Sequence, residues 1–257
     1  DQPRSRGLGD VYKRQEKHTI TMKNPYYRVW LAICFATLMS VQGYAQNKET
    51  ASRLATYFSP GTTDVISPDD DGFIRRWLLL EPIDKPNHSN TVFTDSYIRK
   101  AFTTEYFPGQ FTVLPKDGDK VKVGKQELTW HALDSKLFNV KLFRFASSLQ
   151  KQIYGVLFWA VTVINCPEDI PNVRISVGSN SASMWWLNGE EVVILSGDRR
   201  MVKDDCLSKR LTLKKGKNII RGAVINGPGM SDFCIRLLDE KGAPVKNITI
   251  SYKSVSY

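Results

Sequence analysis

One dipeptide constrains the fold of this chain more than any other: Asn188-Gly189, which lies between two apolar runs. Asn and Gly both tolerate the positive φ that a type I′ turn requires, and this turn joins antiparallel strands. The runs at 183–187 and 190–194 therefore predict a β-hairpin. The chain is expected to be a β-protein.

A second hairpin is expected a short distance further on. Leu211 and Leu213 alternate with polar neighbours, the chain turns at Lys215-Gly216, and apolar residues resume at Ile219. Alternation of this kind is typical of a strand with one buried face. Two hairpins so close together favour a sandwich of antiparallel strands.

Strand-like runs separated by turn residues continue along most of the chain. We expect them at 73–83, 111–114, 121–123, 128–133, 138–145, 154–164, 173–177, 221–225, 233–238 and 245–252. One short helix is expected after Thr94, which can cap it, because apolar residues from Tyr97 onward fall on one helical stripe. This pattern predicts an all-β fold: a two-sheet antiparallel jelly-roll sandwich with one short helix.

Both ends of the sequence are expected to be foreign. The DNA string GAT GTG TAT AAG AGA CAG, which encodes residues 10–15, resembles a transposon end used in sequencing adapters. Residues 1–21 are therefore interpreted as adapter-derived and upstream sequence. Residues 254–257 match the reverse complement of the same string. We expect a truncation at 253–257 and a native chain that continues past Lys253.

Segment 22–45 has the three parts of a signal peptide. Lys23 and Arg28 make its start basic, residues 29–41 are apolar, and small residues precede a cleavage point after Ala45. The apolar stretch is shorter than the roughly 20 residues that a transmembrane helix needs. We expect an exported protein, periplasmic, at the cell surface or extracellular, with no membrane span after cleavage.

The mature chain is expected to contain one domain. Residues 46–71 are polar and rich in turn residues, which indicates a flexible approach segment, and residues 72–252 form the β-sandwich. Without residues 1–45, which hold seven Lys or Arg and three Asp or Glu, the net charge falls from +10 to +6. This charge is spread out rather than clustered, which argues against a nucleic-acid partner.

Three cysteines remain after the expected cleavage: Cys166, Cys206 and Cys234. Each lies in or beside an apolar run. Two interpretations stay open, small buried side chains or one disulfide with a third free thiol. The spacing fits no zinc pattern, so no metal is expected.

Motifs for catalysis or cofactor binding do not occur in the sequence. Gly-x-Ser-x-Gly is missing, as are phosphate loops and dinucleotide fingerprints, so neither a cofactor nor a catalytic residue is expected. The histidines His88 and His131 are expected to be surface or packed residues. Asp198, Asp204 and Asp205 leave a small enzyme with a carboxylate pair as an alternative.

A carbohydrate site needs only an aromatic face and a few planar polar groups. Trp185 and Trp186 are adjacent on a predicted strand, so they point to opposite faces, and one of them is expected to be exposed. Other aromatic residues are expected in the core: Trp130, Tyr154 and Trp159. The candidate carbohydrate-binding residues are Trp185, Trp186, Asp198, Arg199, Arg200, Asp204 and Asp205. The alternative for the charged loop is a solvated surface with local salt bridges.

Several segments carry a resemblance to a known class of module: 174–179, 186–189, 211–218, 233–237 and 239–242. Together they resemble the galactose-binding-like β-sandwich of secreted bacterial carbohydrate-active enzymes. Across residues 67–252 the chain is similar to the N-terminal module of secreted acetylxylan esterases. Asn180-Ser181-Ala182 departs from the pattern, because such modules commonly carry Asp-Asp-Gly there, and this puts a calcium or ligand role of the turn in doubt.

The resemblance implies a non-catalytic accessory module, structural or carbohydrate-binding, from the N-terminal part of a secreted polysaccharide-degrading enzyme, an acetylxylan esterase. It implies two partners: a plant-type polysaccharide such as xylan, and a C-terminal catalytic domain of the same chain. The alternative is a self-contained glycan-binding surface or periplasmic protein, with a true C-terminus near Tyr257.

Overall fold

The computed structural model describes residues 48–252 continuously, and residues 29, 32, 33, 37, 40, 45 and 46 individually. The expectations for 1–21 and 253–257 fall outside these residues, and most of the expected signal peptide does as well. By its internal contacts the chain divides into Asp1–Asn47 and Lys48–Tyr257, and the second unit holds the sandwich. Among the described residues no helix has the length and apolar character to cross a membrane.

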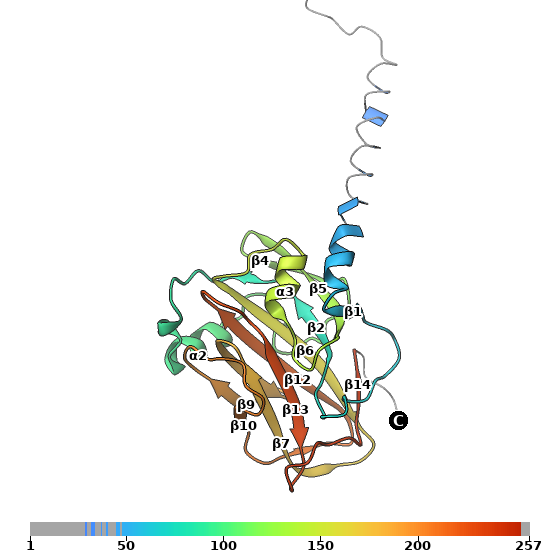
Figure 1. Cartoon of the computed structure of the whole chain (residues 1–257), viewed down its shortest axis with the longest axis vertical. Coiled ribbons are helices and arrows are strands. Elements are labelled where there is room, and N and C mark those ends of the chain that lie inside the picture. Colours follow the sequence, from blue (N-terminus) through green and yellow to red (C-terminus); the bar gives the residue numbers. More distant parts are fainter. Residues whose placement is uncertain are drawn as a thin grey trace, which may run out of the picture. The chain divides into compact units, whose positions relative to one another are not determined.

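The described fold consists mainly of strands (Figure 1). The strands are β1 (Phe58–Pro60), β2 (Arg76–Leu80), β3 (Ile83–Asp84), β4 (Lys120–Val123), β5 (Gln126–Ser135), β6 (Val156–Cys166), β7 (Ile170–Ser179), β8 (Ala182–Leu187), β9 (Glu190–Leu195), β10 (Cys206–Leu207), β11 (Leu211–Leu213), β12 (Gly216–Asn226), β13 (Phe233–Leu238) and β14 (Thr249–Ser251). The helices are the 3-10 turn η1 (Asn90–Val92), α2 (Asp95–Thr103) and α3 (Leu142–Ser148). Residues 48–54 are also helical.

The strands form two antiparallel sheets, which confirms the predicted sandwich. The ten-stranded sheet has the order β1-β5-β2-β6-β12-β8-β9; β3 and β14 pair with β6, and β4 pairs with β5. The four-stranded sheet has the order β10-β7-β11, with β13 also paired to β7. The central pair of the large sheet, β6 and β12, stays in register from Val156↔Asn226 to Cys166↔Gly216.

The hairpin predicted at Asn188-Gly189 is confirmed. Strands β8 and β9 pair antiparallel, and their turn has φ of 52° at Asn188 and 90° at Gly189. Positive φ at both residues is what a type I′ turn requires. The side chain of Asn188 adds a link to the next strand, because its Oδ1 accepts from the backbone N–H of Ile219 at 2.8 Å.

The second predicted hairpin is wrong. β11 pairs with β7 of the small sheet, whereas β12 pairs with β6 and β8 of the large sheet. The chain therefore changes sheets at Lys214 and Lys215 instead of folding back on itself. The side chain of Asn218 holds this crossing, because it accepts from Lys214 N at 3.0 Å and donates to Lys214 O at 2.7 Å. Alternation indicates a strand with a buried face, but it does not say which strand is the partner.

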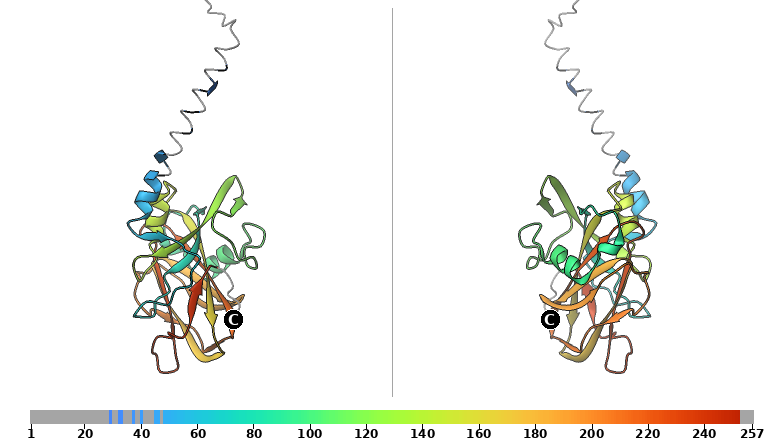
Figure 2. Two further views of the ribbon diagram at one scale, coloured as in Figure 1. Left: turned by 90° about the vertical axis from the view of Figure 1, so that its right-hand side faces the viewer. Right: turned by 90° about the vertical axis from the view of Figure 1, so that its left-hand side faces the viewer.

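The large sheet is buried on both faces, which separates two apolar cores. The core between the sheets contains Trp77, Trp185 and Phe233. The core on the outer face contains Trp159 and Trp186, and is covered by α2 and the segment 104–114 (Figure 2). Burial on both faces explains why β2, β6 and β8 read as continuous apolar runs rather than alternating ones.

The helix predicted after Thr94 is confirmed as α2, where Thr94 Oγ1 accepts from the backbone N–H of Tyr97 at 3.4 Å. The strand expected at 138–145 is wrong, because this stretch runs into α3. Leu142, Phe145 and Ala146 are buried at the spacing of a helix. In a segment this short, helical spacing and strand-like alternation are hard to tell apart. The strand expected at 111–114 is wrong, because residues 111 and 112 belong to a turn and residues 113 and 114 have no regular structure. One short helix was therefore too few.

The sandwich begins before residue 72. Strand β1 lies in the expected approach segment and pairs with β5, and Phe58 is part of the core between the sheets. Further on, Ile66 forms a bridge with Ile250. The polar composition of 46–71 hid these contacts, because a three-residue strand carries little periodicity of its own.

Candidate functional site

Trp185 is fully buried between the two sheets. Its ring lies edge-on to Trp77 with centroids 6.0 Å apart, and 4.9 Å from the ring of Phe233. Its indole N–H donates to Ser183 Oγ at 3.0 Å, so the polar atom is satisfied inside the core. Trp185 is a packing residue.

Trp186 points to the opposite face, as adjacent strand residues must, but it is only 7% exposed. It stacks on Trp159, and Phe111 meets both rings edge-on. The expectation of one exposed tryptophan is therefore wrong. The covering segment 104–114 lies some 70 or more residues away in sequence from this strand, so the local pattern gave no sign of it. Trp130 and Trp159 are buried as expected.

The charged loop 196–205 is held by one ion pair to β13 and one within the loop. Asp204 accepts from the guanidinium of Arg236 at 2.8 Å and from the hydroxyl of Ser176. The hydrogen bond from Arg236 lowers the pKa of Asp204, which keeps it ionised. Asp205 accepts from Arg199 Nε at 2.9 Å. Asp204 and Asp205, two of the three candidates for a catalytic carboxylate pair, thus form ion pairs with arginines.

The same loop rests directly on β7. A Cβ on Gly178 would lie 1.9 Å from the carbonyl oxygen of Val202. Only glycine leaves room for such a close approach of two backbones.

Asp198 and Arg200 are the exposed members of the predicted site. Asp198 Oδ1 accepts from Asn90 Nδ2 at 2.9 Å. The structure therefore divides the seven predicted residues into two buried indoles, one partly buried set of ion pairs, and two exposed charged side chains.

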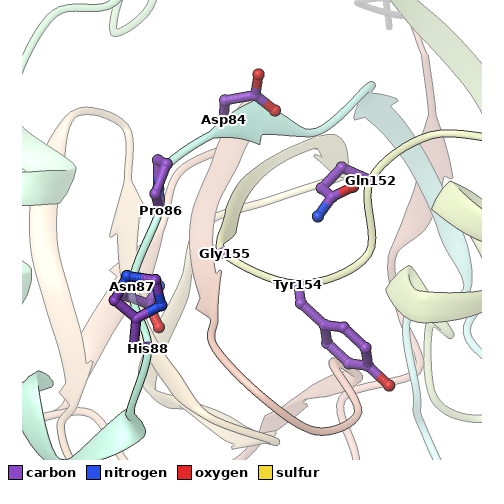
Figure 3. A pocket seen from close by; sticks show the side chains of 7 residues that line it. All are labelled: Asp84, Pro86, Asn87, His88, Gln152, Tyr154 and Gly155. Atoms are coloured by element: carbon purple, nitrogen blue, oxygen red, sulfur yellow. The ribbon is translucent and has the colours of Figure 1, made fainter.

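An open hollow lies between residues 84–88 and residues 152–155 (Figure 3). Its volume is about 510 Å³. It is lined by Asp84, Pro86, Asn87, His88, Gln152, Tyr154 and Gly155. Tyr154 is 45% exposed, so the expectation that it belongs to the core is wrong.

The two walls of the hollow are fixed by backbone contacts. β3 pairs with the start of β6 through Ile83↔Leu157, and Lys85 N donates to Gly155 O at 2.8 Å. Gly155 has φ of 62°, and a Cβ there would lie 3.2 Å from Pro86 Cα. The positive φ ends the extended chain just before β6, which leaves Tyr154 outside the strand. The ring of Phe143 supports Tyr154 with centroids 6.2 Å apart.

Two asparagines bind the hollow to the neighbouring loop 226–231. Asn87 Nδ2 donates to Lys85 O at 3.1 Å and to Asn226 O at 3.3 Å. Asn90 Nδ2 donates to Pro228 O at 2.9 Å, in addition to its bond with Asp198. These donors fix the orientation of both amides.

The oxygens of the same two amides are buried and have no hydrogen-bond partner among the described residues. A Cβ on Gly227 would lie 2.2 Å from Asn90 Oδ1 and 2.4 Å from Asn87 Oδ1. Buried acceptors without partners are uncommon and are typical of functional or strained positions. Asn226, which is fully buried, also leaves its Oδ1 unpaired within the described structure.

The cysteines Cys166, Cys206 and Cys234 are free thiols. This decides between the two interpretations of the sequence in favour of unpaired side chains. Burial raises the pKa of Cys166 to about 11 and that of Cys234 to about 12. Within the described residues, no group of three or more His, Cys, Asp or Glu is arranged to hold a metal ion.

Comparison with protein-family models and with curated proteins finds no match. Solved structures give remote similarities. A PA14 sugar-binding domain from an RTX adhesin is 11% identical over 72% of this chain and 99% of its own, with a TM-score of 0.39. The PA14 domain of the MpAFP antifreeze protein is 12% identical over 74% of this chain and 96% of its own, also at 0.39. A β-glucosidase from Kluyveromyces marxianus is 18% identical over 64% of this chain and 15% of its own, at 0.30. At such scores the similarity does not define a family for this chain.

Proposed function

We propose that the sandwich is a non-catalytic, carbohydrate-binding accessory module of a secreted polysaccharide-degrading enzyme, with its glycan site in the hollow beside Tyr154. One observation carries this proposal: the exposed residue Tyr154 lines a hollow together with four planar polar side chains, those of Asp84, Asn87, His88 and Gln152. The proposal therefore moves the aromatic platform from the two tryptophans to Tyr154.

The chemistry of the lining supports a sugar ligand. The apolar face of a pyranose packs on an aromatic ring, and its hydroxyls need donors and acceptors in fixed places. Gln152 and His88 offer both, and Asp84 offers acceptors. A volume of about 510 Å³ lies inside the range of about 300–1,000 Å³ that is typical of ligand sites.

We further propose xylan as the ligand and an acetylxylan esterase as the parent enzyme. Both rest on the resemblance of residues 67–252 to the N-terminal module of such enzymes. Export through a signal peptide at 22–45 belongs to the same proposal. In this arrangement the sandwich holds the enzyme near its polysaccharide while a separate catalytic domain removes acetyl groups.

The binding proposal is tested by calorimetric titration of the full chain with xylohexaose. Tyr154→Ala should abolish the heat of binding, and Tyr154→Phe should retain most of it because the ring face remains. Val65→Ala, another exposed apolar residue, serves as the control. Absence of binding at millimolar xylohexaose and at millimolar cello- and galacto-oligosaccharides would refute a glycan site.

The parent enzyme is tested on DNA. The genomic sequence after the codon of Lys253 should continue into a hydrolase domain with a serine nucleophile. A stop codon there would instead favour the alternative, a self-contained glycan-binding protein at the cell surface or in the periplasm.

A further inference from the structure

We infer that the glycan site extends from the hollow across Asn90 to Asp198, and that its ligand is a stretch of several sugar units rather than a single sugar. This inference rests on the proposed function. It adds the class of ligand and a second binding position, at Asp198, which is one of the residues singled out in the sequence.

The first support is a continuous chain of contacts along this end of the sandwich. Asn87 lines the hollow and donates to Asn226 O. Asn90, three residues further on, donates to Pro228 O and to Asp198 Oδ1, both at 2.9 Å. Three loops, 84–93, 196–205 and 226–231, are thereby joined into one surface. A surface that is already ordered loses little conformational entropy when a ligand binds.

The second support is the backbone at Gly227, which lies between the two asparagines. A Cβ there would come within 2.2 Å and 2.4 Å of their side-chain oxygens, so both amides pack against a residue without a side chain. Gly227 is itself buried beneath the two amides. Glycine at this place lets both asparagines lie directly against the backbone, which holds the surface between the hollow and Asp198 in one arrangement.

The third support is the set of exposed groups on these loops. Val92 on loop 84–93 is 40% exposed, Met230 on loop 226–231 is 59% exposed, and Tyr154 lines the adjoining hollow. At the far end of the joined surface Asp198 is exposed, and no described residue donates to its Oδ2. A glycan chain presents apolar ring faces and hydroxyl edges, and exposed apolar side chains and a free carboxylate oxygen suit contacts with these two kinds of surface.

The carboxylate also indicates the charge of the ligand. An ionised Asp198 accepts a hydrogen bond from a sugar hydroxyl, and such charge-assisted bonds are roughly twice as strong as neutral ones. The same carboxylate repels an acidic sugar. We therefore expect a neutral oligosaccharide at this position.

The test compares xylo-oligosaccharides of two to six units by calorimetry with the full chain. Affinity should rise with length for the wild-type protein. Asp198→Asn should weaken xylohexaose about tenfold, the effect of losing one charge-assisted hydrogen bond, and leave xylobiose unchanged. Glu190→Gln, which changes an exposed carboxylate at the start of β9, is the matched control and should change neither.

A second variant acts on the middle of the surface. Gly227→Ala should displace Asn87 and Asn90 and reduce the preference for long chains, with circular dichroism used to verify the fold. If all lengths bind equally and Asp198→Asn has no effect, the extended site is wrong, although loss of binding in Tyr154→Ala would still support the hollow. If no xylo-oligosaccharide of any length binds, and millimolar cello- and galacto-oligosaccharides do not bind either, both the extended site and the proposed function are wrong.

Discussion

The indole rings of Trp159 and Trp186 stack with centroids 5.5 Å apart and an angle of 19° between their planes. Trp159 lies on β6 and Trp186 on β8, with β12 between these strands. Phe111 from the covering segment 104–114 contacts both rings edge-on. Stacked aromatic rings at a protein surface are typical of ligand platforms, but these rings face the inside of the molecule. Their contribution is to the stability of the outer core.

We expect Trp186→Ala to lower the free energy of unfolding by about 3–5 kcal/mol, because it removes a large buried side chain and leaves a cavity. Glycan affinity of the folded protein should not change. Chemical denaturation followed by titration at a temperature well below the melting point measures both quantities. Tyr154→Ala should show the reverse pattern, with a loss of stability within about 0.5 kcal/mol and no binding. A loss of binding in Trp186→Ala without loss of stability would contradict this assignment.

The ion pair between Asp204 and Arg236 should make stability depend on pH. Arg236 lowers the pKa of Asp204 in the folded state, so the folded protein holds the proton less tightly than the unfolded chain does. The stabilisation is therefore present above the unfolded pKa of about 3.9 and is lost as the pH falls through the lower folded value.

Melting temperatures of the wild-type protein and of Asp204→Asn, measured from pH 7 to pH 3, test this dependence. The variant should be less stable at pH 7, and the difference should shrink toward acid pH. Glu190→Gln again serves as a control, since the charge of this exposed residue at the start of β9 should have little influence on stability. A difference that stays constant across this range would show that Asp204 acts through packing alone.

The thiols should differ in reactivity according to their burial. Cys166 and Cys234 are buried, and their raised pKa values leave almost no thiolate at pH 8. Cys206 is half-buried, and burial raises its pKa as well. We expect alkylation of the native protein to begin at Cys206, and the other two to react only after unfolding in guanidinium. Peptide mass spectrometry identifies the sites, and a cysteine that requires prior reduction would reveal a disulfide that contradicts the structure.

The local features of the sequence predicted the fold where a few adjacent residues decide the outcome. Asn188 and Gly189 define their turn by their own φ preferences, and Thr94 defines the start of α2 by a hydrogen bond three residues away. The partner of β11 is decided by distant residues, because Leu213 is buried between the sheets and β7 is paired there. Alternation within 211–220 carries no information about that choice.

The candidate site shows the same difference between features set by adjacent residues and features set by distant ones. Asp198 lies in a charged loop and is exposed there, as such a loop predicts, whereas Trp186 is buried because its cover comes from residues 104–114. The sequence predicts Tyr154 in the core because it directly precedes an apolar run, but Tyr154 is exposed. Gly155 was the available signal, since a glycine before a strand indicates a turn and places the preceding residue outside the sheet.

The close approach of Val202 O to Gly178 has a consequence for protein engineering. The position of loop 196–205 is set by a glycine on β7, in a different strand, and not by the loop's own sequence alone. A replacement loop with new side chains at the positions of Asp198 and Arg200 should keep its placement as long as residue 178 remains glycine. Libraries that vary this loop therefore need an invariant residue that lies outside the varied segment.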